Sequence, residues 1–517
     1  MYRDGLAIPL PNHIPGVFLE KTEDGLAVLV ERFVRTRGPF TTFDLSSRFG
    51  LSAPHALAEL ESIEKQGRVM RGPFTPSPRG AEWCDVDALR RIRKASLFRA
   101  RGGVQPVESR DYARFLSVWH GVASVEAPTD DSGGALIAAI EQLQGCPLPA
   151  SALEVDILAS RVSDYRPLDL DLLAARGEVV LEGRGALGLR DGKVALYLAP
   201  NRVLLGRPSP DPLKTDLHQR VRSILQLKGA LFLPEIAAFC AGVRPTDIVD
   251  ALWGLFWNGE VTNDSVAALR ARTTDPARSP GRRFVAAHMR RYRSRVDIPA
   301  DGAGRFSMLS PHPGESVESR LATIEQWLQR HGVLTREAIQ AEANEGGFGA
   351  VYPILRALEE RGQLRRGYFI EGPGALQFAD PFAVDRMREL KASFSEARAA
   401  VLAATDPANP FGMTLPWPPW CDGKGERRAR QHVVIADGEL TALLFADGAR
   451  VQVHQGDAGS DGDRRARLSA QAIVRWMRRR ALRIIGHEGV SSPLNAGALA
   501  KALSEAGLTP SGPGFRL

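Results

Sequence analysis

The order of apolar and polar positions predicts a unit that recurs along the chain: three short helices, then a glycine and a basic β-hairpin. In the first copy, the apolar residues within 26–33 have the spacing of one helical face. Thr41 or Thr42 can cap a second helix and Ser52 a third, because these side chains accept hydrogen bonds from the free amides of a helix start. Residues 67–72 then predict a strand that continues into a wing.

A second copy begins near Gly134, where apolar residues again have helical spacing. Residues 177–181 combine a glycine with β-branched residues, so they are expected to start the hairpin. Gly183-Arg184-Gly185 and Asp191-Gly192 predict turns, because glycine adopts the positive φ that tight turns require. Residues 194–198 supply the closing strand.

Two more copies are predicted, from Leu217 to Asn263 and from Ser319 to Phe378. In the third copy Pro245 is expected to open the third helix, since proline fits the first turn of a helix. In the fourth copy Thr335 is expected to cap the second helix, and residues 362–369 to form the hairpin. The third helix and wing of such a module form its DNA-facing side, although winged helices also serve as protein-binding modules or spacers.

From Ala403 onward the pattern changes from helical spacing to short apolar runs separated by turns. Two strands are predicted within 433–445, because they flank an Asp-Gly pair that is typical of hairpins. Together with further short strands they indicate a small β-barrel. Residues 456–463, rich in Gly and Asp, are expected to form a mobile loop, followed by a helix over 469–484.

These patterns predict an α+β fold of tandem winged-helix domains followed by a small β-barrel module. The chain has 517 residues, too many for one hydrophobic core, and domain sizes of ~100–150 residues indicate several domains. Their expected ranges are 1–86 for the first winged helix with an N-terminal extension, 87–210 for a helical linker and the second, 211–300 for the third with an Arg-rich segment, 301–395 for the fourth, and 396–517 for the β-barrel module with a C-terminal helix.

Composition excludes several classes of protein. The chain contains no run of about 18 apolar residues and no N-terminal signal pattern, so we expect a cytoplasmic protein without a membrane partner. Its four cysteines form no CxxC pair, which leaves neither a disulfide framework nor a zinc site. A Walker A motif, a G-x-S-x-G elbow and an H-E-x-x-H motif are all missing from the sequence. We therefore expect no ATPase motor, no metal and no cofactor in this chain.

The net charge of +7 is modest, but arginines gather in three runs, at 278–295, 424–430 and 464–483. Guanidinium groups bind phosphate oxygens bidentately, so such runs favour a nucleic-acid backbone, while a solvated surface is the alternative. The candidate DNA-binding residues are Arg282, Arg283, Arg290, Arg291, Arg293, Arg365, Arg366, Tyr368, Arg427 and Arg428. Tyr368 is either one face of a hairpin or a platform on which a base stacks. Glu59, Glu61 and Glu64 argue against the first module as a tight groove reader.

Six strings resemble the C-terminal region of Lhr, the large helicase-related proteins of bacteria. They are Tyr2–Leu6, Gly38–Thr42, Glu82–Asp85, Leu255–Asp264, Gly367–Gly372 and Ala404–Gly412. In that family an N-terminal ATPase core precedes this region, so we expect the chain to be a piece of a longer protein with Met1 added at the cut. The resemblance implies an architecture like that of AlkZ/YcaQ-type DNA glycosylases, self-association as a tetramer, and removal of damaged or uracil bases. The implied partners are duplex or single-stranded DNA, the protein's own helicase core and other copies of the chain.

The resemblance also directs attention to residues 116–122, where the glycosylase relatives place a Gln-x-Gln motif. Here Trp119 and His120 stand in its place. We take both as catalytic candidates together with Asp156, one of several acids that follow; a core aromatic and a capping or surface acid are the alternatives.

Three functions remain open. The first is a monofunctional DNA glycosylase, which flips a base and hydrolyses its glycosidic bond. The second is a non-catalytic scaffold that binds DNA and oligomerises. A transcription regulator is the weakest of the three, because repressors seldom chain this many modules.

Overall fold

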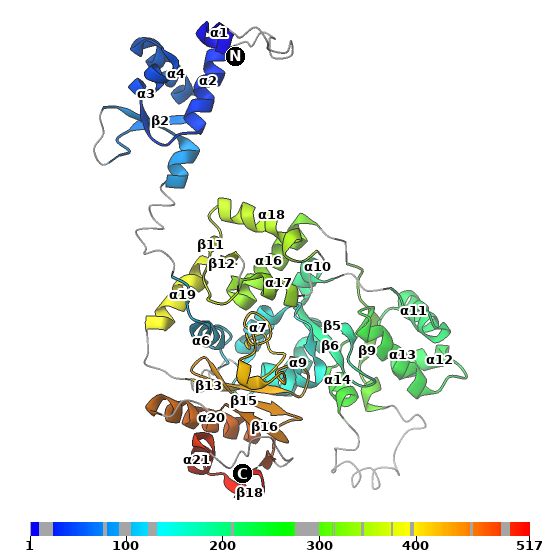
Figure 1. The fold of residues 1–517 in the computed structure, drawn as a ribbon. Coiled ribbons are helices and arrows are strands. Elements are labelled where there is room, and N and C mark those ends of the chain that lie inside the picture. The colour runs from blue at the N-terminus through cyan, green and yellow to red at the C-terminus, as the bar shows by residue number, and fades with distance from the viewer. Residues whose placement is uncertain are drawn as a thin grey trace, which may run out of the picture. The chain divides into compact units, whose positions relative to one another are not determined.

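The structure is a computed structural model, and the residues that it describes form two compact units, Met1–Gln105 and Pro106–Leu517 (Figure 1). It describes residues 2–9, 24–75, 80–92, 105–122, 132–207, 211–274, 299–312, 314, 316–342, 346–373, 376–392, 398–454, 459–486 and 497–517. Over these ranges, every helix is too short or too polar to cross a membrane.

The smaller unit is one winged-helix module. Its elements are α1 (Tyr2–Leu6), α2 (Gly25–Arg35), β1 (Phe40–Thr41), α3 (Thr42–Phe49), α4 (Ala53–Lys65), β2 (Val69–Gly72) and β3 (Glu82–Asp85). Thr41 starts α3 through a capping box: its side chain accepts from the Asp44 amide, and the Asp44 carboxylate accepts from the Thr41 amide at 2.7 Å. Ser52 precedes α4 as predicted, but its side chain makes no capping hydrogen bond.

The second module follows α6 (Ser109–Trp119) in the larger unit. Its elements are α7 (Ser132–Leu143), β4 (Leu148–Pro149), α8 (Ala150–Ala152), the π-helical turn η2 (Leu153–Leu158), α9 (Pro167–Ala175), β5 (Val179–Ala186) and β6 (Gly192–Leu198). The turn predicted at 183–185 is wrong, because these residues lie inside β5 around a β-bulge. Gly183 is needed there for close approach: a Cβ at this position would lie 1.8 Å from the Phe256 carbonyl oxygen.

The third module packs against the second, and residues such as Leu181, Val194 and Trp253 belong to one shared core. Its elements are η3 (Ala199–Asn201), α10 (Arg202–Leu205), α11 (Asp216–Lys228), β7 (Leu231–Phe232), α12 (Leu233–Phe239), α13 (Pro245–Trp257), β8 (Val261–Asn263), α14 (Val266–Thr273), η6 (Ala300–Gly302) and β9 (Arg305–Met308). Pro245 opens α13 as predicted. The wing is much longer than expected, since residues 264–304 separate its two strands and β9 lies beyond the boundary predicted at residue 300.

The fourth module comprises α16 (Val317–His331), β10 (Val333–Leu334), α17 (Arg336–Ala341), α18 (Gly347–Glu360), β11 (Arg365–Gly367), β12 (Gln377–Ala379) and α19 (Pro381–Ala392). Thr335 caps α17 as predicted, accepting a hydrogen bond from the Ala338 amide. Between the two strands of the wing, the Phe369 carbonyl accepts from the Val107 amide at 2.8 Å, and the Glu371 amide donates to the Val107 carbonyl at 2.9 Å. The segment that enters the larger unit is therefore held on this module.

The predicted β-rich module is present as an antiparallel sheet in the order β13-β14-β15-β16, and the Asp437-Gly438 turn joins its two middle strands. The strands are β13 (Ala399–Ala403), β14 (His432–Ala436), β15 (Glu439–Phe445) and β16 (Arg450–Val453), with the 3-10 turn η7 (Pro419–Cys421) between the first two. No pairing of β13 with β16 occurs among the described residues, so closure into a barrel stays a prediction.

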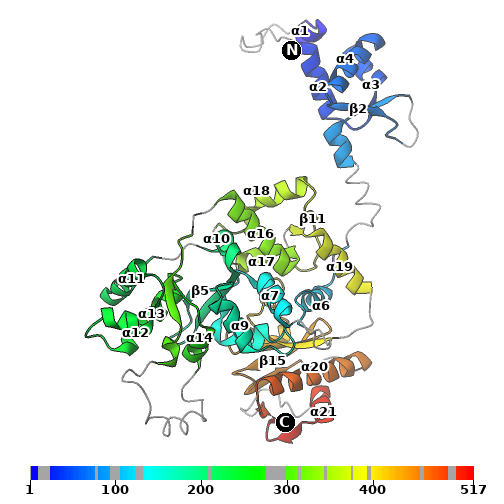
Figure 2. The same cartoon turned by 180° about the vertical axis from the view of Figure 1, so that it is seen from behind.

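One face of this sheet is covered by α20 (Ser460–Arg479), and α21 (Ala498–Glu505) packs on α20 away from the sheet (Figures 1 and 2). The predicted mobile loop is wrong for residues 460–463, which form the first turn of α20. Asp461 and Asp463 lie in that turn, where negative charge is favoured by the helix dipole. The helix also ends earlier than predicted, at Arg479.

A further small sheet at the C-terminus was not predicted. It consists of β17 (Ile484–Ile485), β18 (Thr509–Ser511) and β19 (Gly514–Arg516), in the order β17-β19-β18. The last strand lies in the middle, as it does in the orders β1-β3-β2, β4-β6-β5, β7-β9-β8 and β10-β12-β11. The C-terminal segment thus repeats the winged-helix sheet a fifth time, with α20 and α21 as described helices.

Candidate functional site

A pocket of about 610 Å³ lies beside the end of α6 and is bordered by α7, the turn after η2 and α16. Ala135, Ala138 and Ala139 give it an apolar floor, because these three small residues share one face of α7. Its volume is in the range typical of small-molecule sites. Trp119 and His120, predicted from the sequence, both line it.

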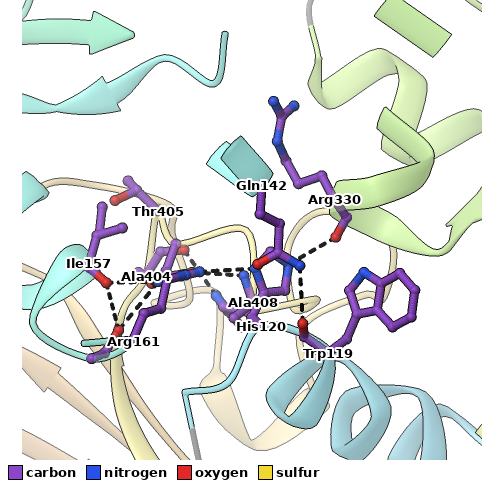
Figure 3. Close-up of polar contacts among 12 residues, drawn as sticks. Trp119, His120, Gln142, Ile157, Arg161, Arg330, Ala404, Thr405 and Ala408 are labelled. Atoms are coloured by element: carbon purple, nitrogen blue, oxygen red, sulfur yellow. Dashed lines mark hydrogen bonds and ion pairs between the residues drawn. The ribbon is translucent and has the colours of Figure 1, made fainter. Parts of the chain in front are cut away.

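His120 is buried, with 3% of its surface exposed, and both ring nitrogens are used (Figure 3). Nε2 lies 2.8 Å from the Arg330 carbonyl oxygen, so it carries the proton. Nδ1 lies 3.1 Å from the Arg161 guanidinium and accepts from it. Burial, and next the charge of Arg161, lower the pKa of His120 well below its ordinary value. His120 is therefore a neutral imidazole that orients its neighbours.

The Arg161 side chain forms a bidentate ion pair with Asp406 at 2.7 and 2.8 Å. Their side chains are 3% and 0% exposed, so the pair is fully buried. Asp406 also accepts from the Ala408 amide at 2.8 Å, which fixes the turn around it. Removal of either charge would leave the other uncompensated in the interior.

Trp119 is anchored at the pocket wall through its indole nitrogen, which donates to the Gln329 carbonyl at 2.6 Å. Its ring packs against Phe115 and Phe382, with centroids 5.1 and 6.0 Å away. The Gln142 amide nitrogen donates to the Trp119 carbonyl at 3.0 Å (Figure 3). Gln142 thus holds the end of α6 while its side chain lines the pocket.

Asp156 does not line this pocket and has a different role. It lies on η2 and pairs with Arg480 at 2.6 and 2.7 Å and with His432 at 3.1 Å. Burial alone would raise the pKa of Asp156, but the contacts with His432 and Arg480 outweigh it and hold the pKa far below its usual value. The structure therefore does not place this predicted catalytic acid with Trp119 and His120; Asp156 joins η2 to the C-terminal module.

Among the described residues that line the pocket, Glu141 is the carboxylate, and the sequence analysis missed it. It is exposed and has no ion-pair partner within the described ranges. A signal was available: the small residues of α7 share a helical face that ends at Glu141-Gln142, where a buried face would carry large apolar residues.

The predicted DNA-binding residues are in four different situations, of which the buried position of Arg427 is described below. Arg366 and Tyr368 are exposed on the wing of the fourth module, Tyr368 at 58%. Arg365 is paired with Asp385 at 2.8 Å, and Arg428 with Glu426 at 2.5 Å. The remaining arginines of the first run lie outside the described residues, and these are Arg282, Arg283, Arg290, Arg291 and Arg293.

Arg427 was predicted to bind DNA, but its side chain is engaged within the protein. Its guanidinium points into the chain and donates to the carbonyls of Asn409 at 2.7 Å, Asp406 at 3.0 Å and Thr405 at 3.1 Å. Burial lowers the pKa of Arg427 to about 10. These bonds hold the loop that carries Asp406, and they leave little of the guanidinium for a phosphate.

A second buried ionic group supports the pocket from the side of α16. Glu342 pairs with Arg330, whose carbonyl holds His120, and with His331 at 2.8 Å. Burial would raise the pKa of Glu342, yet the charge of Arg330 and the contact with His331 bring it down to about 2, from an ordinary value of 4.5.

This depressed pKa predicts a loss of stability in acid. The Glu342 contribution is fully present above about pH 4.5 and is lost as the pH falls toward about 2, because the unfolded chain then binds the proton more readily. Urea midpoints measured from pH 6 to 2 should therefore decline less steeply in Glu342→Gln than in the wild type. Equal slopes would show that this carboxyl does not carry the acid sensitivity.

Family comparisons agree with this architecture. Two models described as "Large helicase-related protein, winged-helix domain" match residues 107–199 and 313–399. The "Lhr helicase/ probable uracil glycosylase" of Mycolicibacterium smegmatis is 37% identical over 478 residues, which cover 89% of this chain and 31% of that protein. The "Lhr helicase/uracil glycosylase" of Escherichia coli K12 is 33% identical over 488 residues, covering 88% of the chain and 31% of that protein.

The chain thus spans about a third of the length of these relatives. The matched models fall on α6 to η3 and on α16 to β13, the segments that form the walls of the pocket. The chain therefore belongs to the large helicase-related (Lhr) family and carries winged-helix domains of that family.

Proposed function

We propose that this chain is the C-terminal DNA-binding and DNA-repair region of an Lhr-type helicase, and that its pocket excises uracil from DNA. The observation that carries the proposal is the pocket itself, with an apolar floor and a polar rim that includes Glu141 and Gln142. Such a slot suits a flat, polar-edged base that has been extruded from a strand. The printed names of two relatives, which include uracil glycosylase, support the choice of base.

Gln142 is the residue we assign to base recognition. Its side-chain nitrogen Nε2 donates to the Trp119 carbonyl, and its side-chain oxygen Oε1 has no partner among the described residues. That oxygen can accept the N3–H of uracil, a hydrogen that a base with an acceptor at this position lacks. The fixed side-chain amide of Gln142 thus favours a base with a hydrogen-bond donor at N3, such as uracil, over a base with an acceptor there.

Glu141 is the residue we assign to the chemistry. A water attacks C1′ of the deoxyribose, the C1′–N1 bond breaks, and uracil leaves with the electron pair. The proton of the water passes to the Glu141 carboxylate, the one carboxylate among the described residues that line the pocket. His120 takes no proton in this scheme, because both its nitrogens are already bonded.

The deciding assay needs no ATP. The chain is incubated with an oligonucleotide that carries one uracil, and abasic sites are then cleaved with alkali. Strand breakage at the uracil is the expected result. Intact strands across uracil and several alkylated bases would exclude the glycosylase.

A non-catalytic scaffold is the second candidate, and one observation favours it. His120 and Asp156, two of the residues suspected of catalysis, are committed to structural contacts. Binding of DNA without strand breakage in the same assay would support this alternative. In either case we propose DNA, the helicase core of the parent protein and other copies of the chain in a tetramer as partners, in the cytoplasm, without a cofactor.

The helices that would enter a major groove are poorly suited to it in two modules. Most of α13 is buried, including Trp253 and Phe256, and the half-exposed and exposed positions of α9 include Asp169 and Asp171. We therefore propose that arginine runs outside these helices provide the main contacts to the DNA backbone.

The Arg-rich segment of the third wing gives a measurable form of this proposal. Replacing Arg290, Arg291 and Arg293 by alanine should flatten the slope of log affinity against log salt by roughly 0.9 per lost contact on duplex DNA. Arg244→Ala is the matched control, since Arg244 is exposed and paired with Asp247. An unchanged slope in the triple variant would show that these three arginines do not contact the DNA phosphates.

A further inference from the structure

A smaller pocket of about 230 Å³ adjoins the first, and Gly121 and Arg161 line both of them. It lies between the turn that follows η2, strand β13 and helix α20. Its volume is below the range of about 300–1,000 Å³ that is typical of sites for small organic ligands. A phosphodiester group is a better match in size than a nucleoside.

Arg475 and Arg479 line this smaller pocket from α20. They are four residues apart, so their side chains lie on the same face of the helix. Arg475 donates to the Ala399 carbonyl at 3.3 Å and Arg479 to the Ala159 carbonyl at 2.9 Å, which fixes one nitrogen of each over the pocket. A guanidinium has five N–H donors, so each retains several for a ligand.

Two nearby arginines, one on α20 and one directly after it, form ion pairs, whereas none is found for Arg475 or Arg479 among the described residues. Arg465 pairs with Glu439 at 3.3 Å, and Arg480 pairs with Asp156 at 2.6 Å. Within the described part of the chain, Arg475 and Arg479 have no carboxylate within ion-pair distance, and the residues that line the smaller pocket include no carboxylate. Two positive charges at a concave site without an acid are suited to an anion.

Ser163, from the turn after η2, adds a neutral donor to the same pocket. It follows η2 and lines the smaller pocket, and its hydroxyl makes no hydrogen bond among the described residues. Ser160 also lines the pocket, but its hydroxyl already donates to the Ile157 carbonyl at 2.8 Å. The pocket therefore presents two guanidinium groups and one free hydroxyl.

We infer that Arg475, Arg479 and Ser163 bind one phosphate of the DNA backbone, next to the nucleotide whose base enters the larger pocket. This inference rests on the proposed function, because the shared wall at Gly121 and Arg161 places the two pockets side by side. The bound phosphate fixes the register of the strand, and the adjacent pocket then receives the base on one side of it. The inference thus assigns a function to two arginines of the third arginine run, residues 464–483.

The test combines a neutral phosphate with a pair of variants. Methylphosphonate is placed at one phosphate at a time around a 2′-fluoro-deoxyuridine, which resists excision, so that affinity is measured without turnover. At one position beside the uridine, the substitution should weaken wild-type binding about tenfold or more, as expected for lost hydrogen bonds to a charged group. The same substitution should cost Arg475→Gln/Arg479→Gln nothing further.

The matched control is Arg467→Gln/Arg478→Gln, because both residues are exposed on α20 and neither lines the smaller pocket. This control should retain the full methylphosphonate penalty. Penalties that are equal in wild type and Arg475→Gln/Arg479→Gln at every position would overturn the inference. Loss of the affinity penalty at that same position in the control variant would overturn the inference as well.

Two further experiments complete the test. The first distinguishes a phosphate of DNA from a free phosphate ion, and the second distinguishes failure of this inference from failure of the proposed uracil excision. Inorganic phosphate, added at constant ionic strength, should not displace DNA from the wild type, since the site is proposed for a phosphate of DNA. Displacement by low millimolar phosphate from the wild type, but not from Arg475→Gln/Arg479→Gln, would instead indicate a site for free anions. If the uracil assay shows no excision but the position-specific penalty is present, the proposed chemistry fails and the phosphate site stands.

Discussion

Replacing Glu141 by glutamine is expected to lower the rate of abasic-site formation about 10²–10⁴-fold, the usual contribution of a positioned general base. The amide has nearly the same shape as the carboxylate but cannot take the proton from the attacking water. DNA affinity should stay the same, because Glu141 is exposed at the rim of the pocket and makes no ion pair within the described ranges. Single-turnover rates on a uracil oligonucleotide, with affinity measured in parallel, distinguish the two effects.

The matched control for this prediction is Glu325→Gln. Glu325 is exposed on α16, which also borders the pocket, but it is not among the lining residues. Its replacement should leave the rate unchanged. A Glu141→Gln chain that excises uracil at the wild-type rate would show that another group activates the water.

Replacing Asp406 by alanine is expected to destabilise the larger unit by about 3–5 kcal/mol, the usual effect of breaking a buried ion pair. The change leaves the Arg161 guanidinium buried beside a neutral imidazole, with neither a counter-charge nor access to water. It also removes the acceptor for the Ala408 amide, so the turn around Asp406 loosens. The urea midpoint of the larger unit in the full chain measures the loss.

An exposed pair of the same chemistry provides the control. Arg244 and Asp247 lie 2.8 Å apart, but their side chains are 80% and 38% exposed. Asp247→Ala should therefore leave the urea midpoint nearly unchanged, because an ion pair in water is screened and contributes little. Similar midpoints for Asp406→Ala and Asp247→Ala would mean that the buried pair contributes no more than a surface pair.

The modules could be predicted because their signals are local. Thr335 and Pro245 stand beside the helices that they start, and Asp437-Gly438 lies between the strands that it joins. A fifth copy was missed because its strands have only two or three residues, too few for an alternating pattern. The turn assigned to Gly183 was wrong for another reason: a glycine required by a distant backbone has the same appearance in the sequence as one required by a turn.

The site could be predicted only in part because it is assembled from distant segments. Trp119 and His120 were identified from their position in the chain, and they do line the pocket. Asp156 was equally plausible in the sequence, but Arg480, 324 residues away, engages its carboxylate. Long-range ion pairs of this kind leave no periodic signal, so the sequence could not distinguish Asp156 from Glu141.

The placement of the last strand in the middle of each three-stranded sheet has a consequence for synthesis on the ribosome. Until that strand emerges, the two earlier strands have no partner, and the module cannot close its core. In the third module residues 264–304 must be made first, a delay of about 2–8 s at typical elongation rates. Chains that stop early would expose unpaired strand edges, so soluble fragments should end after Asp85, Leu198, Met308, Ala379 or Arg516.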